Sequence, residues 1–154
     1  KTLMPCNSYG ENDNYDSNSS HFLPALVKKI IDAIRNKEES ITLWGNGKSL
    51  RELIFSEDVA SACSYFLNKN TKDKIINIGS GIEYTIEDYA RIIMKNLNVK
   101  LKILYDQNKP NGTFRKLLDS KLANRYGWKS RTTFEKGIRI VVNDYLKNNI
   151  SKFS

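Results

Sequence analysis

The chain has 154 residues, of which 40% are hydrophobic and 27% are charged; this excludes bulk disorder and allows one domain with a buried core. The net charge of +8 favours anionic partners, although lysines on solvated faces would supply most of it on the simplest interpretation. No run of like charge exceeds three residues, so a basic tail for nucleic acid is not expected.

Cysteine usage and hydropathy indicate the cellular setting. Cys6 and Cys63 do not form a disulfide framework, and we expect a reduced, cytoplasmic protein. No apolar run approaches the roughly 20 residues that cross a bilayer, and no signal peptide is expected. One histidine and two distant cysteines do not supply the usual ligands of zinc, so we expect no metal.

Hydrophobic periodicity and turn residues predict strands that alternate with helices, which is typical of an α/β protein. In chain order, the expected elements are a buried strand at 2–9, a polar loop at 11–20, a helix at 22–37, strands at 41–44 and 52–55, a helix ending near 67, a strand at 74–78, a helix ending near 97, a strand at 101–105, and helices at 117–126 and 132–147. Ser56 is expected to cap one helix, and Thr85 with Asp88 to form a capping box on the next. The apolar stretch directly after Lys1 suggests a strand entered from an upstream segment, and hence a piece of a longer protein.

Two glycine-containing loops carry the strongest functional signal. One reads WGNGKSLRE from Trp44 to Glu52, and the other reads NKPNGTFRKLLD from Asn108 to Asp119. Such turns present backbone N–H groups beside cations, which suits a phosphate-bearing ligand with a flat ring, such as a nucleotide. Trp44 is then a stacking surface or a core aromatic, and Arg51 binds phosphate or pairs with a neighbouring glutamate.

His21 is the only histidine and lies where the polar loop enters a helix. It is either a residue that caps this helix or a functional imidazole. Tyr-x-x-x-Lys strings occur at Tyr65 and Tyr105, but about one such match is expected by chance, so both are rejected. The glycines of INIGSG, from Ile76 to Gly81, indicate a turn better than they indicate a phosphate loop.

Taken in order, four pieces of the chain resemble the GDP-L-fucose synthase family of extended short-chain dehydrogenases/reductases. They are MPCNSYGENDNYDSNSSHFLPALVKK, WGNGKSLRELIFSEDVA, INIGSGIEYTIEDYA and KPNGTFRKLLDSKLANRYGW. The resemblance covers nearly the whole chain but only the C-terminal half of a family member. It implies the last strands and helix of a Rossmann domain plus a small α/β substrate-binding domain, divided as 1–21 (end of the Rossmann domain), 22–55 (substrate-binding segment), 56–81 (returning Rossmann helix and strand) and 82–154 (substrate-binding domain).

The resemblance also implies roles for the residues near the start of the chain. Pro5, Cys6, Asn7 and Ser8 would line the nicotinamide side of an NADP(H) site. His21 would contact this cofactor and act as the catalytic acid/base that returns a proton to carbon during epimerisation. The other half of the family fold would carry the catalytic Ser and the Tyr-x-x-x-Lys pair, so this chain alone is not expected to turn over substrate.

The GDP-sugar would be bound by Lys29, Trp44, Arg51, Asn111 and Lys116. Arg51 and Lys116 would neutralise the pyrophosphate with help from Lys29, while Trp44 would form an aromatic wall and Asn111 a hydrogen bond. Two positions depart from the family pattern: Lys29 replaces a common Arg, and Asn111 replaces a common Asp.

These departures leave alternatives open. The sugar is that of GDP-L-fucose or another GDP- or UDP-deoxy-sugar, for instance a heptose. A polyanion-binding module is the alternative from another class, but dispersed cations disfavour it. No nucleic-acid or membrane partner is expected, and relatives form homodimers mainly through the half that is absent here.

Overall fold

The computed structural model describes residues 1–16 and 19–150, and it is an α/β protein. The helices are α1 (Phe22–Arg35), α2 (Ser56–Asn68), α3 (Ile86–Asn96), α4 (Lys121–Arg125) and α5 (Phe134–Ile150). The strands are β1 (Thr2–Pro5), β2 (Asn7–Tyr9), β3 (Ser40–Trp44), β4 (Leu50–Phe55), β5 (Ile75–Ile78), β6 (Glu83–Thr85), β7 (Lys102–Asp106) and β8 (Arg115–Lys116). The predicted alternation of strands and helices is confirmed.

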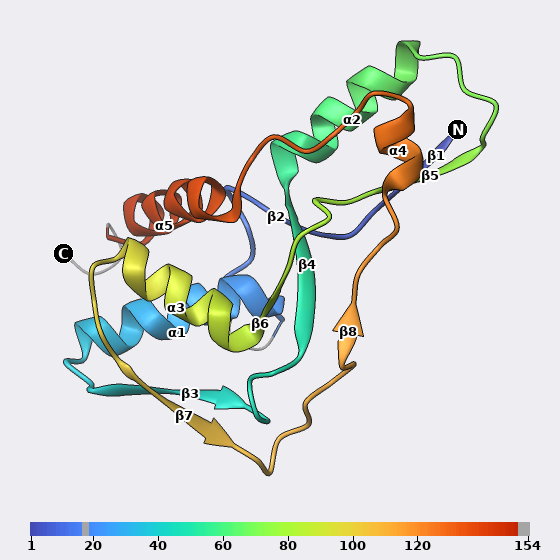
Figure 1. Cartoon of the computed structure of the whole chain (residues 1–154). Helices are drawn as coiled ribbons and strands as arrows, with labels where there is room; N and C mark the ends of the chain where they lie inside the picture. The colour runs from blue at the N-terminus through green and yellow to red at the C-terminus, as the bar shows by residue number, and fades with distance from the viewer. Residues whose placement is uncertain (17–18, 151–154) are drawn as a thin grey trace.

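In the described part of the chain the strands form three small sheets, and most of the pairs are parallel. β1 pairs with β5, and β3 pairs with β7, each in parallel. In the third sheet, β4 pairs in parallel with β2 and β8 and antiparallel with β6. Figure 1 shows β4 running between a lobe formed by α2, α4, β1 and β5 and a lobe formed by α1, α3, α5, β3 and β7.

Each lobe has its own apolar core. The larger core joins the buried faces of α1, α3 and α5, with Ile30, Ile93 and Ile138 fully buried. In the smaller core α2 packs against β5 and α4, and the Trp128 side chain is buried among them. Each core contains residues from both early and late parts of the chain. The division of the chain at residues 21, 55 and 81 stays a prediction.

The start of the chain differs from the single buried strand predicted at 2–9. It forms two strands that break at Cys6 and join different sheets, and Met4 is 49% exposed. The reason is that β1 pairs only with β5 among the described residues, so much of its surface stays uncovered. The prediction failed because apolar composition does not distinguish a buried strand from one at the edge of a sheet.

Helix starts were partly predicted. The capping box of Thr85 and Asp88 is confirmed, with both reciprocal hydrogen bonds present. The prediction for Ser56 was wrong by one residue, because α2 begins at Ser56 and its N-cap is Phe55. The strands β6 and β8 were not predicted, since each is too short to show a period.

Two buried carboxylates connect β4 and α2 to distant loops. The Glu52 carboxylate is 1% exposed and accepts the backbone N–H groups of Gly81 (2.7 Å) and Leu118 (2.8 Å). Asp58 does the same for Arg131 (3.1 Å) and Thr132 (2.9 Å). Buried charges persist only where such partners satisfy them, so each carboxylate fixes a long-range connection.

Replacing Glu52 by Gln should destabilise the fold by about 1.5–3 kcal/mol, because an amide offers one acceptor oxygen where two backbone donors converge. Urea unfolding of both chains would measure the difference in free energy. Glu57→Gln, at an exposed position two residues beyond β4, is the control and should change stability by less than about 0.5 kcal/mol. Equal stability of all three chains would contradict the assigned role of Glu52.

Candidate functional site

The two glycine loops meet in space through Asn111. Its side-chain Oδ1 accepts the backbone N–H of Asn46 at 2.7 Å, and its carbonyl oxygen accepts the Ser49 hydroxyl at 2.7 Å. Gly45 has φ +64°, and a Cβ there would lie 2.1 Å from Asn111 Oδ1. A glycine is therefore required at position 45 both by backbone conformation and by this close approach.

Arg51 and Lys116 are neighbours on adjacent strands. β4 and β8 are in parallel register, with the Cα of Arg51 opposite that of Lys116. The Arg51 guanidinium donates to the carbonyl oxygens of Leu50 (2.7 Å) and Thr113 (2.6 Å), so its direction is set by both loops. The alternative in which Arg51 pairs with Glu52 is wrong, because the Glu52 carboxylate is buried and accepts backbone N–H groups.

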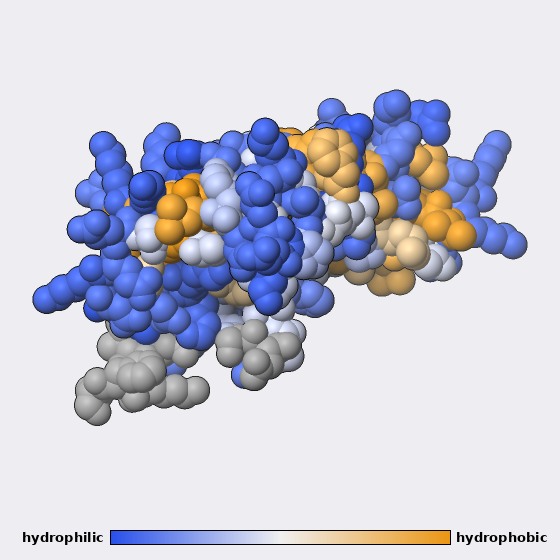
Figure 2. All heavy atoms as spheres, turned by 90° about the horizontal axis from the view of Figure 1, so that it is seen from below, coloured by the Kyte–Doolittle hydropathy of each residue, from blue (hydrophilic) through white to orange (hydrophobic). Residues whose placement is uncertain are grey.

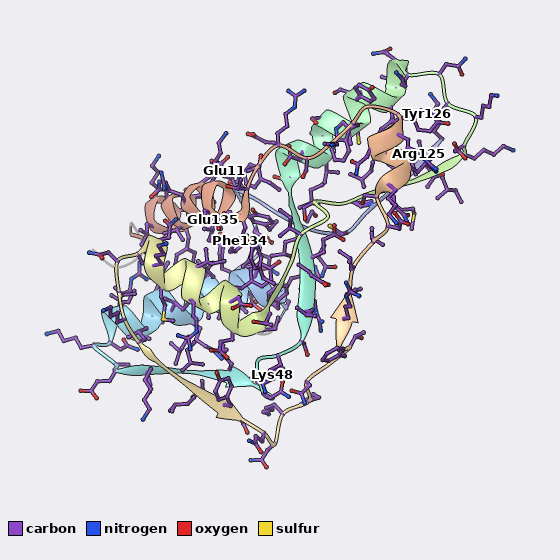
Figure 3. The ribbon with its side chains drawn as sticks, in the orientation of Figure 1. Glu11, Lys48, Arg125, Tyr126, Phe134 and Glu135 are labelled. Carbon is purple, nitrogen blue, oxygen red and sulfur yellow. The ribbon has the colours of Figure 1, made fainter. Side chains whose placement is uncertain are left out.

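Trp44 lies at the end of β3, beside the first glycine loop, and is 63% exposed, so its interpretation as a core aromatic is wrong. The Lys109 ammonium lies 5.5 Å from the centroid of its ring. On the neighbouring α1, Lys29 donates to the carbonyl oxygen of Thr42 at 2.7 Å, and burial lowers the pKa of its ammonium. Lys48, labelled in Figure 3, lies in the turn between β3 and β4. Three cations thus surround this end of β3 and its turn.

His21 is exposed and is the N-cap residue of α1, as the helix-capping interpretation expected, but its side chain makes no capping hydrogen bond. The next residue, Phe22, packs on Tyr89 with ring centroids 5.7 Å apart. The Tyr89 hydroxyl in turn donates to the carbonyl oxygen of Arg51 at 2.8 Å. This chain of contacts connects the start of α1 to the strand that carries Arg51.

The segment Pro5 to Ser8 lies at the other end of β4. Asn7 and Ser8 pair with Leu53 and Ile54 in β2–β4, two and three residues beyond Arg51. The Cys6 N–H donates to the carbonyl oxygen of Ile78 at 2.9 Å. Burial raises the pKa of the Cys6 thiol to about 12, with a smaller contribution from the Glu52 carboxylate, so this thiol stays protonated at neutral pH.

The rejected tyrosines are tied to structural partners. The Tyr65 hydroxyl donates to the carbonyl oxygen of Tyr126 at 2.6 Å, and the Tyr105 hydroxyl donates to Glu87 at 2.6 Å. Their rejection as catalytic phenols stays a prediction. A hollow of about 480 Å³ between residues 12–16, α1 and α5 contains none of the predicted site residues.

Sequence reasoning missed several residues that organise the site. Ser49 and Glu52 were not selected, although both fall inside the WGNGKSLRE motif. The available signal for Glu52 was a carboxyl group at the head of the apolar run ELIF, where an unpaired charge would be costly. Within residues 1–16 and 19–150, no group of three or more His, Cys, Asp or Glu could hold a metal ion, and no helix is long and apolar enough to cross a membrane.

The parallel strand pairs and their helices, with loops gathered at strand ends, define a Rossmann-type α/β protein of the extended short-chain dehydrogenase/reductase class. Residues 1–79 match the sequence profile of the NAD dependent epimerase/dehydratase family. The chain belongs to this family.

Individual relatives agree with the resemblance to GDP-L-fucose synthases. The chain is 41% identical over 152 residues to the GDP-L-colitose synthase of Yersinia pseudotuberculosis, covering 97% of this chain and 49% of that protein. It is 38% identical to GDP-L-fucose synthase 1 of Arabidopsis thaliana, covering 94% of this chain and 45% of that protein. A GDP-L-fucose synthetase from Naegleria fowleri solved with NADP is similar in structure, with a TM-score of 0.87, 25% identity, and coverage of 97% and 47%. The chain spans about half the length of the curated relatives it matches, and corresponds to their C-terminal half.

The contact of Asn111 with the first loop gives a test by substitution. Asn111→Ala should destabilise the chain by about 0.5–1.5 kcal/mol, because the Asn46 N–H loses its acceptor. Asn111→Asp keeps an oxygen at the accepting position, so it should stay within about 0.5 kcal/mol of the unsubstituted chain. Urea unfolding measures both, and equal losses would contradict the proposed connection between the loops.

Proposed function

We propose that this chain is the substrate-binding half of a GDP-deoxy-sugar epimerase/reductase that uses NADPH and makes GDP-L-fucose. The single observation that carries the proposal is the pairing of Arg51 with Lys116 on adjacent strands, beside two converging glycine loops. Two cations held on one short stretch of sheet suit a pyrophosphate, and the exposed Trp44 ring suits a ligand that also carries flat groups.

In this proposal the substrate pyrophosphate contacts Arg51 and Lys116. The planar guanidinium of Arg51 offers further N–H donors to phosphate oxygens, while Lys116 is exposed and acts as a point charge. Lys29, whose ammonium is bound to the carbonyl oxygen of Thr42 on β3, adds a further positive charge. Asn111 holds the first glycine loop through its Oδ1 and its carbonyl oxygen, and its side-chain NH2 group donates a hydrogen bond to the ligand.

The proposed cofactor site uses Pro5, Cys6, Asn7, Ser8 and His21. These residues fit the edge of a dinucleotide site, because ligands of open α/β sheets bind beyond the carboxyl ends of parallel strands and Pro5 ends β1. NADPH, when bound, supplies the hydride that reduces the 4-keto group of the sugar. The neutral Cys6 thiol and the exposed Ser8 would pack against or hydrogen-bond the cofactor.

His21 is the proposed acid/base. The ketone acidifies the C–H bonds of the carbons beside it, so a base supplied by the other half of the enzyme can take up such a proton and leave an enolate. The exposed imidazole would return a proton to the opposite face of this carbon, which inverts its configuration. An imidazole can both accept and donate a proton, so it suits this exchange.

Other assignments complete the proposal. We place the protein in the cytoplasm, in keeping with its two free cysteines, Cys6 and Cys63. The complete enzyme would be a homodimer through the half that this chain lacks, which would also carry the catalytic Ser and Tyr-x-x-x-Lys residues. The alternative substrate is another GDP- or UDP-deoxy-sugar, and the likeness to a GDP-L-colitose synthase favours GDP. Competition between GDP and UDP for the chain would separate these.

Arg51→Ala and Lys116→Ala should each weaken GDP binding by about 1.5–3 kcal/mol, as expected for lost hydrogen bonds to a charged ligand. Titration calorimetry with GDP measures the loss. Arg115→Ala is the matched control, because Arg115 precedes Lys116 on β8 and its guanidinium is held by Glu83 at 2.7 Å. Unchanged affinity in both variants would remove the pyrophosphate assignment.

Replacing His21 by Ala, in an active enzyme that contains this chain, should abolish hydrogen exchange at the carbons beside the ketone. Reduction of an already epimerised ketone should continue, since the hydride and the second proton come from other groups. Deuterium incorporation followed by NMR, with NADPH consumption measured in parallel, tests both steps. If both steps fall together, His21 has a structural role.

A further inference from the structure

Phe114 stands out as an exposed aromatic beside the proposed pyrophosphate site. Its side chain is 71% exposed, and it lies between Thr113, which binds the Arg51 guanidinium, and Arg115. Single exposed apolar residues are common and by themselves indicate nothing. The surroundings of this ring distinguish it.

The backbone of Phe114 is held on both sides although its ring is exposed. Its carbonyl oxygen accepts the Leu50 N–H at 2.8 Å, which continues the β4–β8 ladder by one bond. The preceding carbonyl, of Thr113, accepts from Arg51 at 2.6 Å, and the following residue, Arg115, is paired with Glu83. Fixed backbone lowers the entropy cost of binding to the ring.

Phe114 is close in the chain to both proposed pyrophosphate cations. It stands at a bend directly before β8, two residues from Lys116. Arg51 lies opposite Lys116 on β4, and its guanidinium donates to the carbonyl oxygen of Thr113, the residue before Phe114. One exposed ring and two cations therefore belong to the same short stretch of backbone.

Figure 2, which views the protein from below relative to Figure 1, shows hydrophilic residues over much of this face and hydrophobic residues gathered mainly on its right-hand side. The exposed ring and the two cations together suit a ligand in which one flat group carries a charged tail. A nucleotide has this construction, with a base at one end and phosphates at the other.

We infer that Phe114 stacks against the base of the bound nucleotide and supplies affinity for a nucleoside diphosphate over inorganic pyrophosphate. The inference rests on the proposed function and adds to Trp44 a second aromatic residue for the flat part of the ligand. Any base can stack on a phenyl ring, so Phe114 would favour nucleotides over ligands without a base. Discrimination between guanine and other bases would require polar groups.

The test compares GDP with inorganic pyrophosphate by titration calorimetry. Phe114→Ala should weaken GDP binding roughly 5- to 100-fold, the range expected for one base–aromatic stack. Phe114→Trp should keep or improve GDP affinity, and pyrophosphate affinity should be the same in all three chains. Leu67→Ala, at a position 81% exposed on α2, is the control and should leave GDP affinity unchanged.

The outcomes are separable. If the unsubstituted chain binds GDP and Phe114→Ala binds it with the same affinity, the inference is overturned and the proposed function stands. Equal weakening of GDP and pyrophosphate in Phe114→Ala also overturns it, because the ring would then act on the loop and not on the base. No GDP binding by the unsubstituted chain overturns the proposed function, and the inference with it.

Discussion

The structure depends on β4, and β4 depends on the buried carboxylate of Glu52. One half of this strand pairs with β8 and sets Arg51 beside Lys116, while the other half pairs with β2, which follows Cys6. The Glu52 side chain, between these halves, accepts N–H groups from the loop after β5 and from the chain after β8. The segment 5–8 and the two glycine loops are therefore aligned by one strand and one charged group.

Much of the fold could be predicted because its helices are amphipathic and well marked. The helix at 22–37 ends as α1 at Arg35, and the capping box of Thr85 and Asp88 starts α3 as expected. The strands β6 and β8 escaped prediction because they exist only through pairing with β4, which is a long-range property. The single strand predicted at 2–9 failed for a similar reason, since pairing and not composition breaks it at Cys6.

The candidate site was predicted in its residue types better than in its internal contacts. The motif around Trp44 and the one around Asn111 both pointed to an anionic ligand, and the structure brings these loops together. The sequence did not reveal that Asn111 holds the first loop, or which groups satisfy the Glu52 carboxylate. Those facts follow from hydrogen bonds between residues some 60 positions apart, for which one sequence holds no signal.

The protonated state of Cys6 has a practical consequence for chemical labelling. A thiol with a pKa of about 12 is ionised to only about one part in a hundred thousand at neutral pH, and the thiolate is the form that attacks maleimides and iodoacetamides. Cys63 is exposed on α2, in the lobe away from the glycine loops. A fluorophore or spin probe can therefore be attached at Cys63 without altering the sequence, where it reports on the molecule from the lobe away from the two glycine loops.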